Sequence, residues 1–531
     1  MATGESYRRS AVSESWDVIV IGSGIGGLTA AALLARGGQR VLVLERHTTA
    51  GGATQTFRRA GYEWDAGLHY MGEVHRPTST LRRLFDYISG GKLEWAPMPD
   101  IYNRVVIDDR VYEYPSGATA FKSRMKEYFP DEAAAIDRYV ELVFETNRTA
   151  RKFFAHRAMP HDIAEQFYRD MCEPFRAFSD RTVSEVLGDL TANTELRAVL
   201  CGHFGDYCLA PARTSFAMHA MLIRHYIDGA SFPVGGSARL AETTAEVICG
   251  AQGAVLVAAD VASVLLDDDG KAGGVLMRDG RRFLAPVVIS DAGAVNTLTK
   301  IVPPHVRDAD VAAAVGSLGP SLPWVVLNIG VRHTDAELGL DGTNIWAHSG
   351  PDIDAEIGAY EADPEHTRMP LYFLSFPSAK DTSWQDRYPG RATIDIGGLT
   401  SWKLFEPYAD TKWMRRGTEY EQLKRKLTDE LLEQVLRFCP QLEGRIDHVE
   451  LATPLSFNHF LGRQYGDFMS LAHSPNRFAL RDLSSHTHIP NLYLSGQDVA
   501  AAGVSGALMG GVVAASAILG RDALADLPTT K

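Results

Sequence analysis

Four glycines near the N-terminus lie between two short apolar runs, at a spacing that suits phosphate binding: Gly22, Gly24, Gly26 and Gly27. The first run, 18–21, is β-branched and uncharged, as in a strand buried on both faces of a parallel sheet, and the second, 41–44, ends at Glu45. Gly22 permits a tight turn, and Gly24 lets the backbone approach a pyrophosphate. Gly27 lets the next helix contact the strand while the helix N-terminus faces the phosphates. Because Glu45 can accept hydrogen bonds from ribose hydroxyls, this order of elements predicts a dinucleotide-binding unit.

The residues after this acid indicate which dinucleotide is bound. Gly51 and Gly52 follow it closely. Such a glycine pair resembles the extended signature of the large superfamily of FAD-binding flavoproteins, which nicotinamide dehydrogenases usually lack. We therefore expect FAD as the cofactor.

A second glycine-rich segment lies near the C-terminus. A strand expected at 491–495 is followed by the turn 496–498, and Gly503 and Gly506 then open an apolar helix. The N-terminus of this helix would place its partial positive charge near the N1–C2=O edge of the flavin, where it stabilises the anionic reduced form. Asp498 is expected beside the ribityl or pyrophosphate chain. Both ends of the chain are thus predicted to contribute to one cofactor site.

These motifs require a fold that the chain enters more than once. We expect an α/β protein in which a discontinuous Rossmann-like FAD-binding domain carries a mixed-sheet substrate domain and a helical cap. The expected parts are a flexible tail (1–15), three FAD-binding segments (16–115, 230–320 and 451–531), the helical cap (116–229) and the substrate domain (321–450). The sheet of the substrate domain is expected to floor a substrate cavity.

Composition narrows the class of protein. The chain has 531 residues, of which 45% are hydrophobic and 22% charged, as in an ordinary soluble globular protein. A formal charge of −13 and the lack of a basic stripe argue against a nucleic-acid partner. The five cysteines are scattered and lack Cys-x-x-Cys spacing, which favours reduced thiols over a disulfide framework or a metal site. The N-terminal residues lack the apolar core of a secretory signal, so we expect a cytoplasmic protein.

Two segments bear on contact with membranes. Residues 499–519 carry no charge and are long enough to span a bilayer, but they are rich in Gly, Ala and Ser, so a buried helix packed on the flavin is expected instead. Residues 148–157 mix cations with two adjacent phenylalanines. This composition suits a helix lying in a membrane interface, and it equally suits a solvated charged face above two core phenylalanines. Peripheral membrane contact is therefore one of two interpretations.

Further motifs are distributed along the whole chain: 67–70, 205–207, 216–220, 225–227, 235–237, 270–275, 376–381, 388–391 and 490–498. In these stretches and in its cofactor motifs the sequence resembles the family of phytoene desaturases, carotenoid isomerases and retinol saturases, and it looks most similar to the all-trans-retinol 13,14-saturases. The resemblance implies a fold of the amine-oxidase and phytoene-desaturase type, with Val261 near the adenine. The candidate cofactor-binding residues are Gly22, Gly24, Gly26, Gly27, Glu45, Arg46, Gly51, Gly52, Thr54, Val261, Gly496, Asp498, Gly506 and Ala507.

The implied reaction is reduction of one double bond in a conjugated apolar lipid, such as all-trans-retinol to 13,14-dihydroretinol or a related polyene. Reduced flavin would deliver a hydride to one carbon, and an acid or water would protonate the other. Because conjugation spreads the developing charge, a dry cavity with few charges can suffice. The candidate proton donors are His69, Glu73, Asp206 and Tyr207, each of which can equally be structural. No second glycine fingerprint is present, so NAD(P)H as reductant would need a different kind of site, or the electrons come from elsewhere.

Several alternatives remain open at this point. Desaturation or cis–trans isomerisation of a carotenoid can use the same scaffold, because a flavin can donate or accept electrons. An amine oxidase that holds FAD through a cysteine is disfavoured, since no cysteine lies between 496 and 511. A non-catalytic lipid-binding escort protein of the same fold is a candidate from another class, against which the intact cofactor motifs argue.

Overall fold

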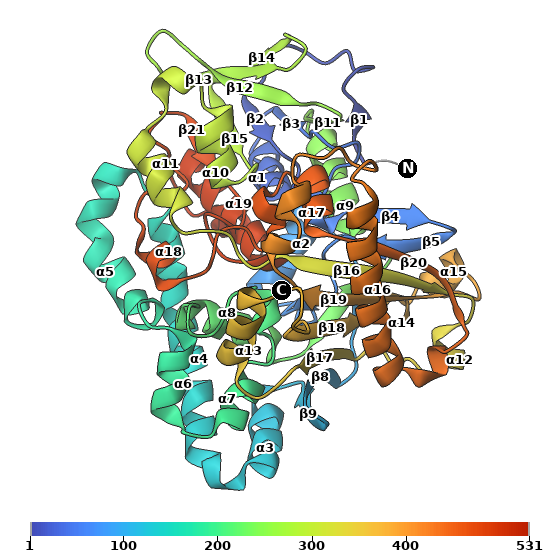
Figure 1. The fold of residues 1–531 in the computed structure, drawn as a ribbon. Helices are drawn as coiled ribbons and strands as arrows, with labels where there is room; N and C mark the ends of the chain where they lie inside the picture. The colour runs from blue at the N-terminus through green and yellow to red at the C-terminus, as the bar shows by residue number, and fades with distance from the viewer. Residues whose placement is uncertain (1–2, 529–531) are drawn as a thin grey trace.

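The computed structural model describes residues 3–528 and consists of three parts arranged around two sheets (Figure 1). A parallel sheet with its helices lies at the top of the view, a larger mixed sheet at the lower right, and a group of helices at the left and bottom. The chain enters the upper part at its N-terminus, in its middle and at its C-terminus. The fold is therefore the expected discontinuous Rossmann-like domain with a mixed-sheet domain and a helical cap.

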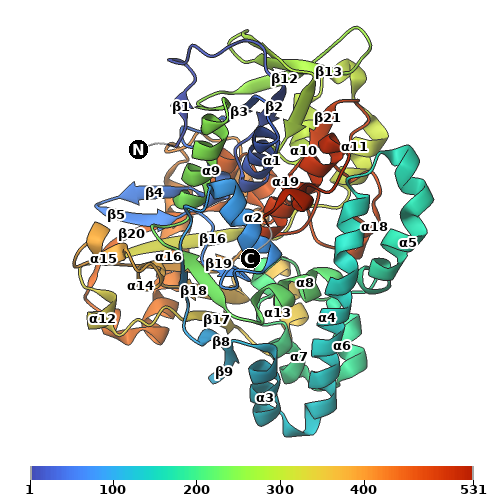
Figure 2. The same ribbon diagram turned by 180° about the vertical axis from the view of Figure 1, so that it is seen from behind.

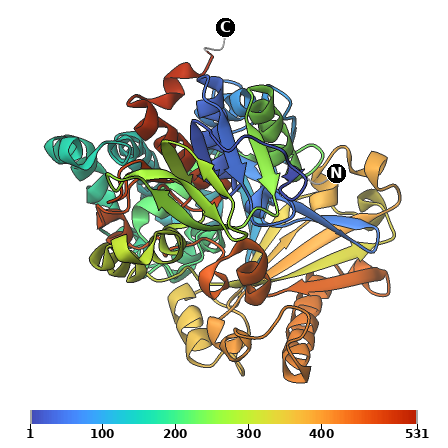
Figure 3. The same cartoon turned by 90° about the horizontal axis from the view of Figure 1, so that it is seen from above.

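The upper sheet is parallel throughout, in the order β1-β11-β3-β2-β15-β21. Its strands are β1 (Glu5–Ser6), β2 (Val18–Ile21), β3 (Val41–Leu44), β11 (Ala254–Val257), β15 (Val287–Ser290) and β21 (Leu492–Leu494). Side chains of β2 alternate between two cores because successive residues of a strand point to opposite faces. Val18 and Val20 pack with helices α1 (Ile25–Arg36), α9 (Ala238–Gly250) and α19 (Gly503–Leu519). Ile19 and Ile21 pack with a small sheet formed by β12 (Val261–Leu266), β13 (Ala272–Met277) and β14 (Arg282–Leu284), which lies across the near side of Figure 3.

The second sheet has seven strands in the order β20-β16-β19-β18-β17-β8-β9. They are β8 (Ile101–Ile107), β9 (Arg110–Pro115), β16 (Trp324–Val331), β17 (Asn344–His348), β18 (Leu371–Ser375), β19 (Ala392–Leu399) and β20 (Ile446–Ala452). One face packs against helix α16 (Thr418–Phe438), through residues such as Leu327 and Ile329. The other face, with Trp346 and Phe373, packs against the cap.

The cap is entirely helical and lies beside both sheets (Figure 2). Its helices are α3 (Ala118–Tyr128), α4 (Ala133–His156), α5 (His161–Ser179), α6 (Val183–Leu190), α7 (Thr194–Leu200) and α8 (Phe216–Tyr226). Helix α2 (Thr80–Ser89) and the short sheets β6-β10-β7 and β4-β5 connect the parts. The strands of these sheets are β4 (Thr56–Arg59), β5 (Tyr62–Asp65), β6 (Met71–Gly72), β7 (Trp95–Pro97) and β10 (Ala230–Pro233).

The segment expected as a flexible tail is folded from residue 3 to residue 15. Strand β1 extends the parallel sheet by pairing with β11. Tyr7 is 5% exposed, and its hydroxyl donates a 2.8 Å hydrogen bond to Asp279 Oδ1. The prediction was wrong because the backbone hydrogen bonds of a sheet edge and one aromatic side chain suffice to order a polar segment.

The boundary predicted at residue 115 is also wrong. Strands β8 and β9 were assigned to the FAD-binding segment, but they belong to the seven-stranded sheet, where β8 pairs in parallel with β17. The partner strand lies more than 200 residues further along the chain, so nothing in the local sequence indicates the pairing.

The two segments considered for membrane contact each pack one face into the interior. Phe153 in α4 is buried and stacks on Phe175 at 4.3 Å between ring centroids, so this stretch has core phenylalanines below a charged face. Eight of the 17 residues of α19 are buried, and this face of the helix packs with α1 in the same core. None of the helices within residues 3–528 combines the length and apolar character needed to cross a bilayer. All five cysteines are free, as expected for reduced thiols.

Candidate active site

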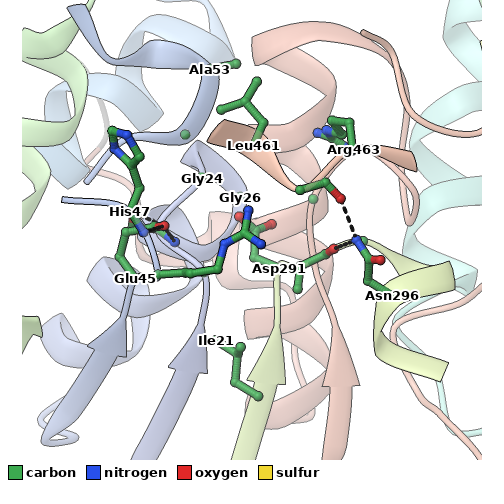
Figure 4. Close-up of a pocket in the computed structure, with 18 of the residues that line it drawn as sticks. Ile21, Gly24, Gly26, Glu45, His47, Ala53, Asp291, Asn296, Leu461 and Arg463 are labelled. Carbon is green, nitrogen blue, oxygen red and sulfur yellow. Dashed lines mark hydrogen bonds between the residues drawn. The ribbon is translucent and has the colours of Figure 1, made fainter. Parts of the chain in front are cut away.

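A cavity of about 400 Å³ lies at the carboxyl edge of the parallel sheet (Figure 4). It is lined by the residues that end or follow β2, β3, β15 and β21. Ligands of open parallel sheets bind at this edge, because loops and helix N-termini converge there. We call it the dinucleotide cavity.

Most of the predicted cofactor-binding residues line this cavity: Gly22, Gly24, Gly26, Glu45, Arg46, Gly51, Gly52, Thr54, Val261, Gly496, Asp498 and Ala507. Gly27 does not, since a Cβ at Gly27 would lie 2.6 Å from the carbonyl oxygen of Gly22, which agrees with the predicted contact between helix and strand. Gly22 has a φ of 95°, as its predicted tight turn requires. Gly506 lines a second cavity instead.

Sequence reasoning missed the carboxyl group at the base of the dinucleotide cavity. Asp291 directly follows β15, and a Cβ built on Gly26 or Gly496 would lie 2.6 or 2.5 Å from its Oδ1. A Cβ on Gly24 would collide with its Oδ2. Burial raises the pKa of Asp291 to about 7. Glycine loops from both ends of the chain thus close around one acid. In the sequence, the position of an aspartate directly after a buried strand could have indicated this residue.

The acid that ends β3 is already hydrogen-bonded. Glu45 Oε2 accepts from the backbone N–H of Ser23 at 2.9 Å and from its hydroxyl at 2.7 Å, and Oε1 accepts from the N–H of His47 at 2.6 Å. These bonds fix the carboxylate at the rim of the glycine loop, which is where a ribose-binding group is expected.

A cation of the dinucleotide cavity was also missed. Arg463 lines the cavity, and no carboxylate of residues 3–528 lies within ion-pair distance of it. Its loop is held by Asn296, whose side-chain amide donates to the carbonyls of Gly462 at 3.0 Å and Ala292 at 3.1 Å, as Figure 4 shows. A guanidinium without a protein partner suits a phosphate.

A larger cavity of about 1150 Å³ lies between the cap, α2 and α19. Its wall combines flexible apolar side chains, including Met71, Met159, Met218, Met221, Met469 and Met509, with charged ones, including Arg76, Arg83, Arg151, Arg224 and Asp522. Thioether side chains adapt to irregular apolar ligands. We call it the lipid cavity. The two cavities meet, because both are lined by Gly67, Phe468, Met469, Gly503 and Val504.

Three of the four predicted proton donors line the lipid cavity: His69, Glu73 and Asp206. Tyr207 does not; it is fully buried in the cap, with its hydroxyl 3.5 Å from Nδ1 of His219. Asp206 accepts a 2.7 Å hydrogen bond from the hydroxyl of Tyr70, and burial raises its pKa to about 7.

The other two candidates differ in charge. Burial would raise the pKa of Glu73, but the hydrogen bond from His225 at 3.3 Å and the charges of His225, Arg224 and Arg76 outweigh it, and the pKa falls. Burial, aided by the nearby Lys380, lowers the pKa of His69 to about 3, so its ring is neutral. Glu73 is thus an ionised, paired carboxylate, whereas His69 is a neutral imidazole in the cavity wall.

The turn before α19 is anchored by a buried cation that the sequence did not single out. Arg477 is fully buried and donates to the carbonyls of Leu471 at 2.8 Å, Asp498 at 3.1 Å and Gln497. Since these carbonyls border the loop that precedes α19, Arg477 holds the helix N-terminus at the junction of the two cavities.

Comparison with known proteins agrees with this geometry. Residues 20–88 match the family model described as an NAD(P)-binding Rossmann-like domain. The fold resembles that of cyclohexylamine oxidase from Brevibacterium oxydans, with a TM-score of 0.60 at 17% identity over 96% of this chain and 98% of that one, a likeness of fold alone.

Two named relatives cover nearly the whole chain. The chloroplastic prolycopene isomerase of Arabidopsis thaliana is 25% identical over 97% of this chain and 85% of its own length. The all-trans-retinol 13,14-reductase of Homo sapiens is 37% identical over 98% of this chain and 88% of its own length. On this similarity, the chain belongs to the all-trans-retinol 13,14-reductase family.

Proposed function

We propose that this protein is an FAD-dependent oxidoreductase that reduces one carbon–carbon double bond of a conjugated apolar lipid. All-trans-retinol is the proposed substrate and 13,14-dihydroretinol the product. The observation that carries the proposal is the junction of two unlike cavities, one polar and glycine-lined, the other large and methionine-lined. Membership of the family supports the choice of substrate.

The dinucleotide cavity fits FAD by the chemistry of its donors. The backbone of 22–27 and the guanidinium of Arg463 suit the pyrophosphate, and Glu45 suits the adenosine ribose. Val261 would face the adenine, and Asp498 the ribityl chain. The N-terminus of α19 would face the flavin ring, where its partial positive charge stabilises a reduced anionic flavin. Reduced FAD bound here would supply a hydride.

The lipid cavity suits an elongated apolar ligand. Its volume of about 1150 Å³ is above the range of roughly 300–1,000 Å³ that is usual for sites of small molecules. The protein's part in the reaction is to hold one double bond at the junction, to exclude water and to deliver a proton. Among the proton-donor candidates we favour His69, two residues from the junction residue Gly67. Glu73 is disfavoured by its cationic partners, and Tyr207 because it does not line the cavity.

Product mass distinguishes reduction from its alternatives. Anaerobic incubation of the reduced protein with all-trans-retinol should give a product heavier by two hydrogens. Loss of two hydrogens with oxidised protein would indicate a desaturase, and unchanged mass with altered double-bond geometry an isomerase. Purified protein without flavin absorbance would favour a lipid-binding escort protein.

We propose NAD(P)H as one source of the electrons. Because FAD would fill the dinucleotide cavity, the nicotinamide would have to reach the flavin ring from another side. Anaerobic mixing of the oxidised protein with NADPH and, separately, with NADH should bleach the flavin absorbance with at least one of them. Absence of bleaching with both would assign the electrons to another donor.

We also propose peripheral contact with lipid bilayers through helix α5. Ile163 lines the lipid cavity and is 43% exposed, and Phe167, one turn further along the helix, is 45% exposed. Two exposed apolar side chains, one of which lines the lipid cavity, would let the protein rest on a bilayer surface and take up a lipid from it. Phe167→Asp should reduce co-sedimentation with phosphatidylcholine vesicles, whereas Phe167→Leu should not.

A further inference from the structure

A buried acid and a buried imidazole face each other behind the wall of the lipid cavity. The side chain of Asp395 is 1% exposed, and within residues 3–528 neither of its oxygens has a hydrogen-bond partner. Nδ1 of His69 is likewise buried without a partner. The ring nitrogen lies 3.7 Å from Asp395 Oδ2. This is slightly beyond hydrogen-bond distance, so two costly unpaired buried polar atoms face each other with no other partner in the described part of the chain.

The alternation of β19 explains the position of the acid. Ala392, Ile394 and Ile396 pack into the core beneath α16, so Asp395 faces the opposite side of the sheet. The segment after β5 runs along this side of the sheet and carries His69. The centroids of the His69 and Phe373 rings are 5.2 Å apart in an edge-on arrangement. His69 is 16% exposed at its side chain and lines the lipid cavity. The imidazole therefore connects Asp395 with the cavity.

A lysine fixes the backbone beneath the imidazole. Lys380 is buried, and its ammonium donates to the carbonyl of His69 at 3.0 Å, to the hydroxyl of Ser375 at 2.7 Å and to Oδ1 of Asn344. These bonds use all three of its hydrogens. Lys380 therefore holds His69 in place; burial lowers the pKa of its ammonium to about 7, against the charges of Asp395 and Asp65, so its positive charge near the acid is lost as pH rises above about 7.

The charged groups around the pair make both members neutral. Burial, aided by the negative charge of Asp65, raises the pKa of Asp395 well above its usual range, and Lys380 only partly opposes this. Burial and then Lys380 lower the pKa of His69. A protonated carboxyl therefore faces a neutral imidazole, and the tautomer that suits this arrangement carries its hydrogen on Nε2 and leaves Nδ1 free to accept.

We propose that Asp395 is a positioning residue that stores the proton which His69 delivers to the substrate. The proposal deepens the proposed function and rests on it. The step would balance: reduced FAD held in the dinucleotide cavity would supply a hydride to one carbon, and the electron pair left on the other carbon would take the Nε2 proton of His69. Nδ1 then takes the proton of Asp395, and the new carboxylate lies near the ammonium of Lys380. A solvent proton restores the acid after the product leaves.

Infrared spectroscopy tests the stored proton without any turnover. The protein at about pH 8 should show a protonated-carboxyl C=O band that Asp395→Asn abolishes. In His69→Phe the band should move to higher frequency, because the acid loses its acceptor. Asp335→Asn is the matched control: Asp335 is a buried carboxyl of the same domain, accepts a 2.6 Å hydrogen bond from Ser378 and lines neither cavity. Persistence of the band in Asp395→Asn would overturn the proposal.

Single-turnover kinetics test the delivery. Asp395→Asn should slow anaerobic flavin reoxidation by all-trans-retinol by roughly 100-fold or more, with FAD content and retinol affinity unchanged. The double variant with His69→Gln should lose no more than the slower single variant, because the two residues act as a unit. If the rate losses of the two single variants multiply in the double variant, or if the FAD content falls, Asp395 has a merely structural role. If the unsubstituted protein does not reduce retinol, the proposed function fails, while the infrared result still decides whether Asp395 holds the proton.

Discussion

The two cavities of this protein differ in how the chain builds them. The dinucleotide cavity is made mainly of loop backbone at one edge of a parallel sheet, and missing Cβ atoms shape it. The lipid cavity is made of side chains from the cap, the dinucleotide domain and the segment between them. The motifs of the dinucleotide cavity each consist of residues that lie close together in the sequence. The functional groups of the lipid cavity come together only when distant segments of the chain fold against each other. This difference teaches that the cofactor can be predicted from spacing, whereas the sequence proposes several acid–base groups and only the structure distinguishes their surroundings.

The strongest test of this difference between the two cavities is at His69, the residue of the lipid cavity that is proposed to donate a proton. His69→Gln should lower the rate of flavin reoxidation by all-trans-retinol by roughly 10²–10⁴-fold, because general acid catalysis is worth about that much. FAD content should stay constant. Asp206→Asn changes an acid that lines the same cavity. In the same stopped-flow assay it should lower the rate of flavin reoxidation by less than His69→Gln does. Equal rates for His69→Gln and the unsubstituted protein would show that His69 does not donate the proton.

The backbone character of the dinucleotide cavity is tested at Gly24. Gly24→Val forces a side chain onto the carboxyl of Asp291, and such overpacking costs about 1–3 kcal/mol. FAD affinity should therefore fall by about 10- to 100-fold, measured as the flavin-to-protein ratio of folded protein. Gly358→Ala is the control, since an added Cβ there meets nothing within 4 Å. Full FAD content in Gly24→Val would mean that the glycine is not required.

The independence of the two cavities is tested by filling one of them. Ala517, on α19, lines only the lipid cavity. Ala517→Trp should weaken all-trans-retinol binding by about 10-fold, or about 1.4 kcal/mol, and leave FAD content unchanged. Ala313→Trp, on the exposed face of α11 (Ala309–Gly316), should change neither. Retinol affinity would be measured by quenching of protein fluorescence, and an unchanged value in Ala517→Trp would place the lipid elsewhere.

The smallest expected effect is a pH dependence of FAD affinity. Burial raises the pKa of Asp291 to about 7, with Glu45 and Asp498 adding to the rise and Arg463 opposing it. A bound pyrophosphate would favour the protonated, neutral acid, so FAD binding should take up a proton as pH rises above about 7. Affinity should then fall between about pH 6 and pH 8 by up to about 10-fold.

Asp291→Asn should remove this dependence, because the amide does not titrate. Fluorescence titration of the apoprotein with FAD at both pH values gives the comparison. If FAD affinity falls by the same factor in Asp291→Asn, the pH dependence comes from another titrating group.

The sequence predicted the parts of the fold whose causes are local. The strand, glycines and helix of 18–36 each follow from neighbouring residues, and φ at Gly22 confirms the turn. Asp291 and Arg463 were missed because their roles come from loops brought to one sheet edge by strands far apart in sequence. Asp395 was missed because a buried acid within an apolar strand has meaning only beside His69. The tail, predicted to be flexible, was misjudged because the pairing partner of β1, strand β11, lies some 250 residues away.

The central claim is that the two cavities bring a flavin and a polyene together, and anaerobic single turnover tests it most directly. Protein carrying fully reduced flavin would be mixed with one equivalent of all-trans-retinol while the flavin absorbance is followed. The account predicts that the flavin reoxidises and that each reoxidised flavin yields one lipid molecule heavier by two hydrogens. Flavin that stays reduced while retinol is bound would contradict it.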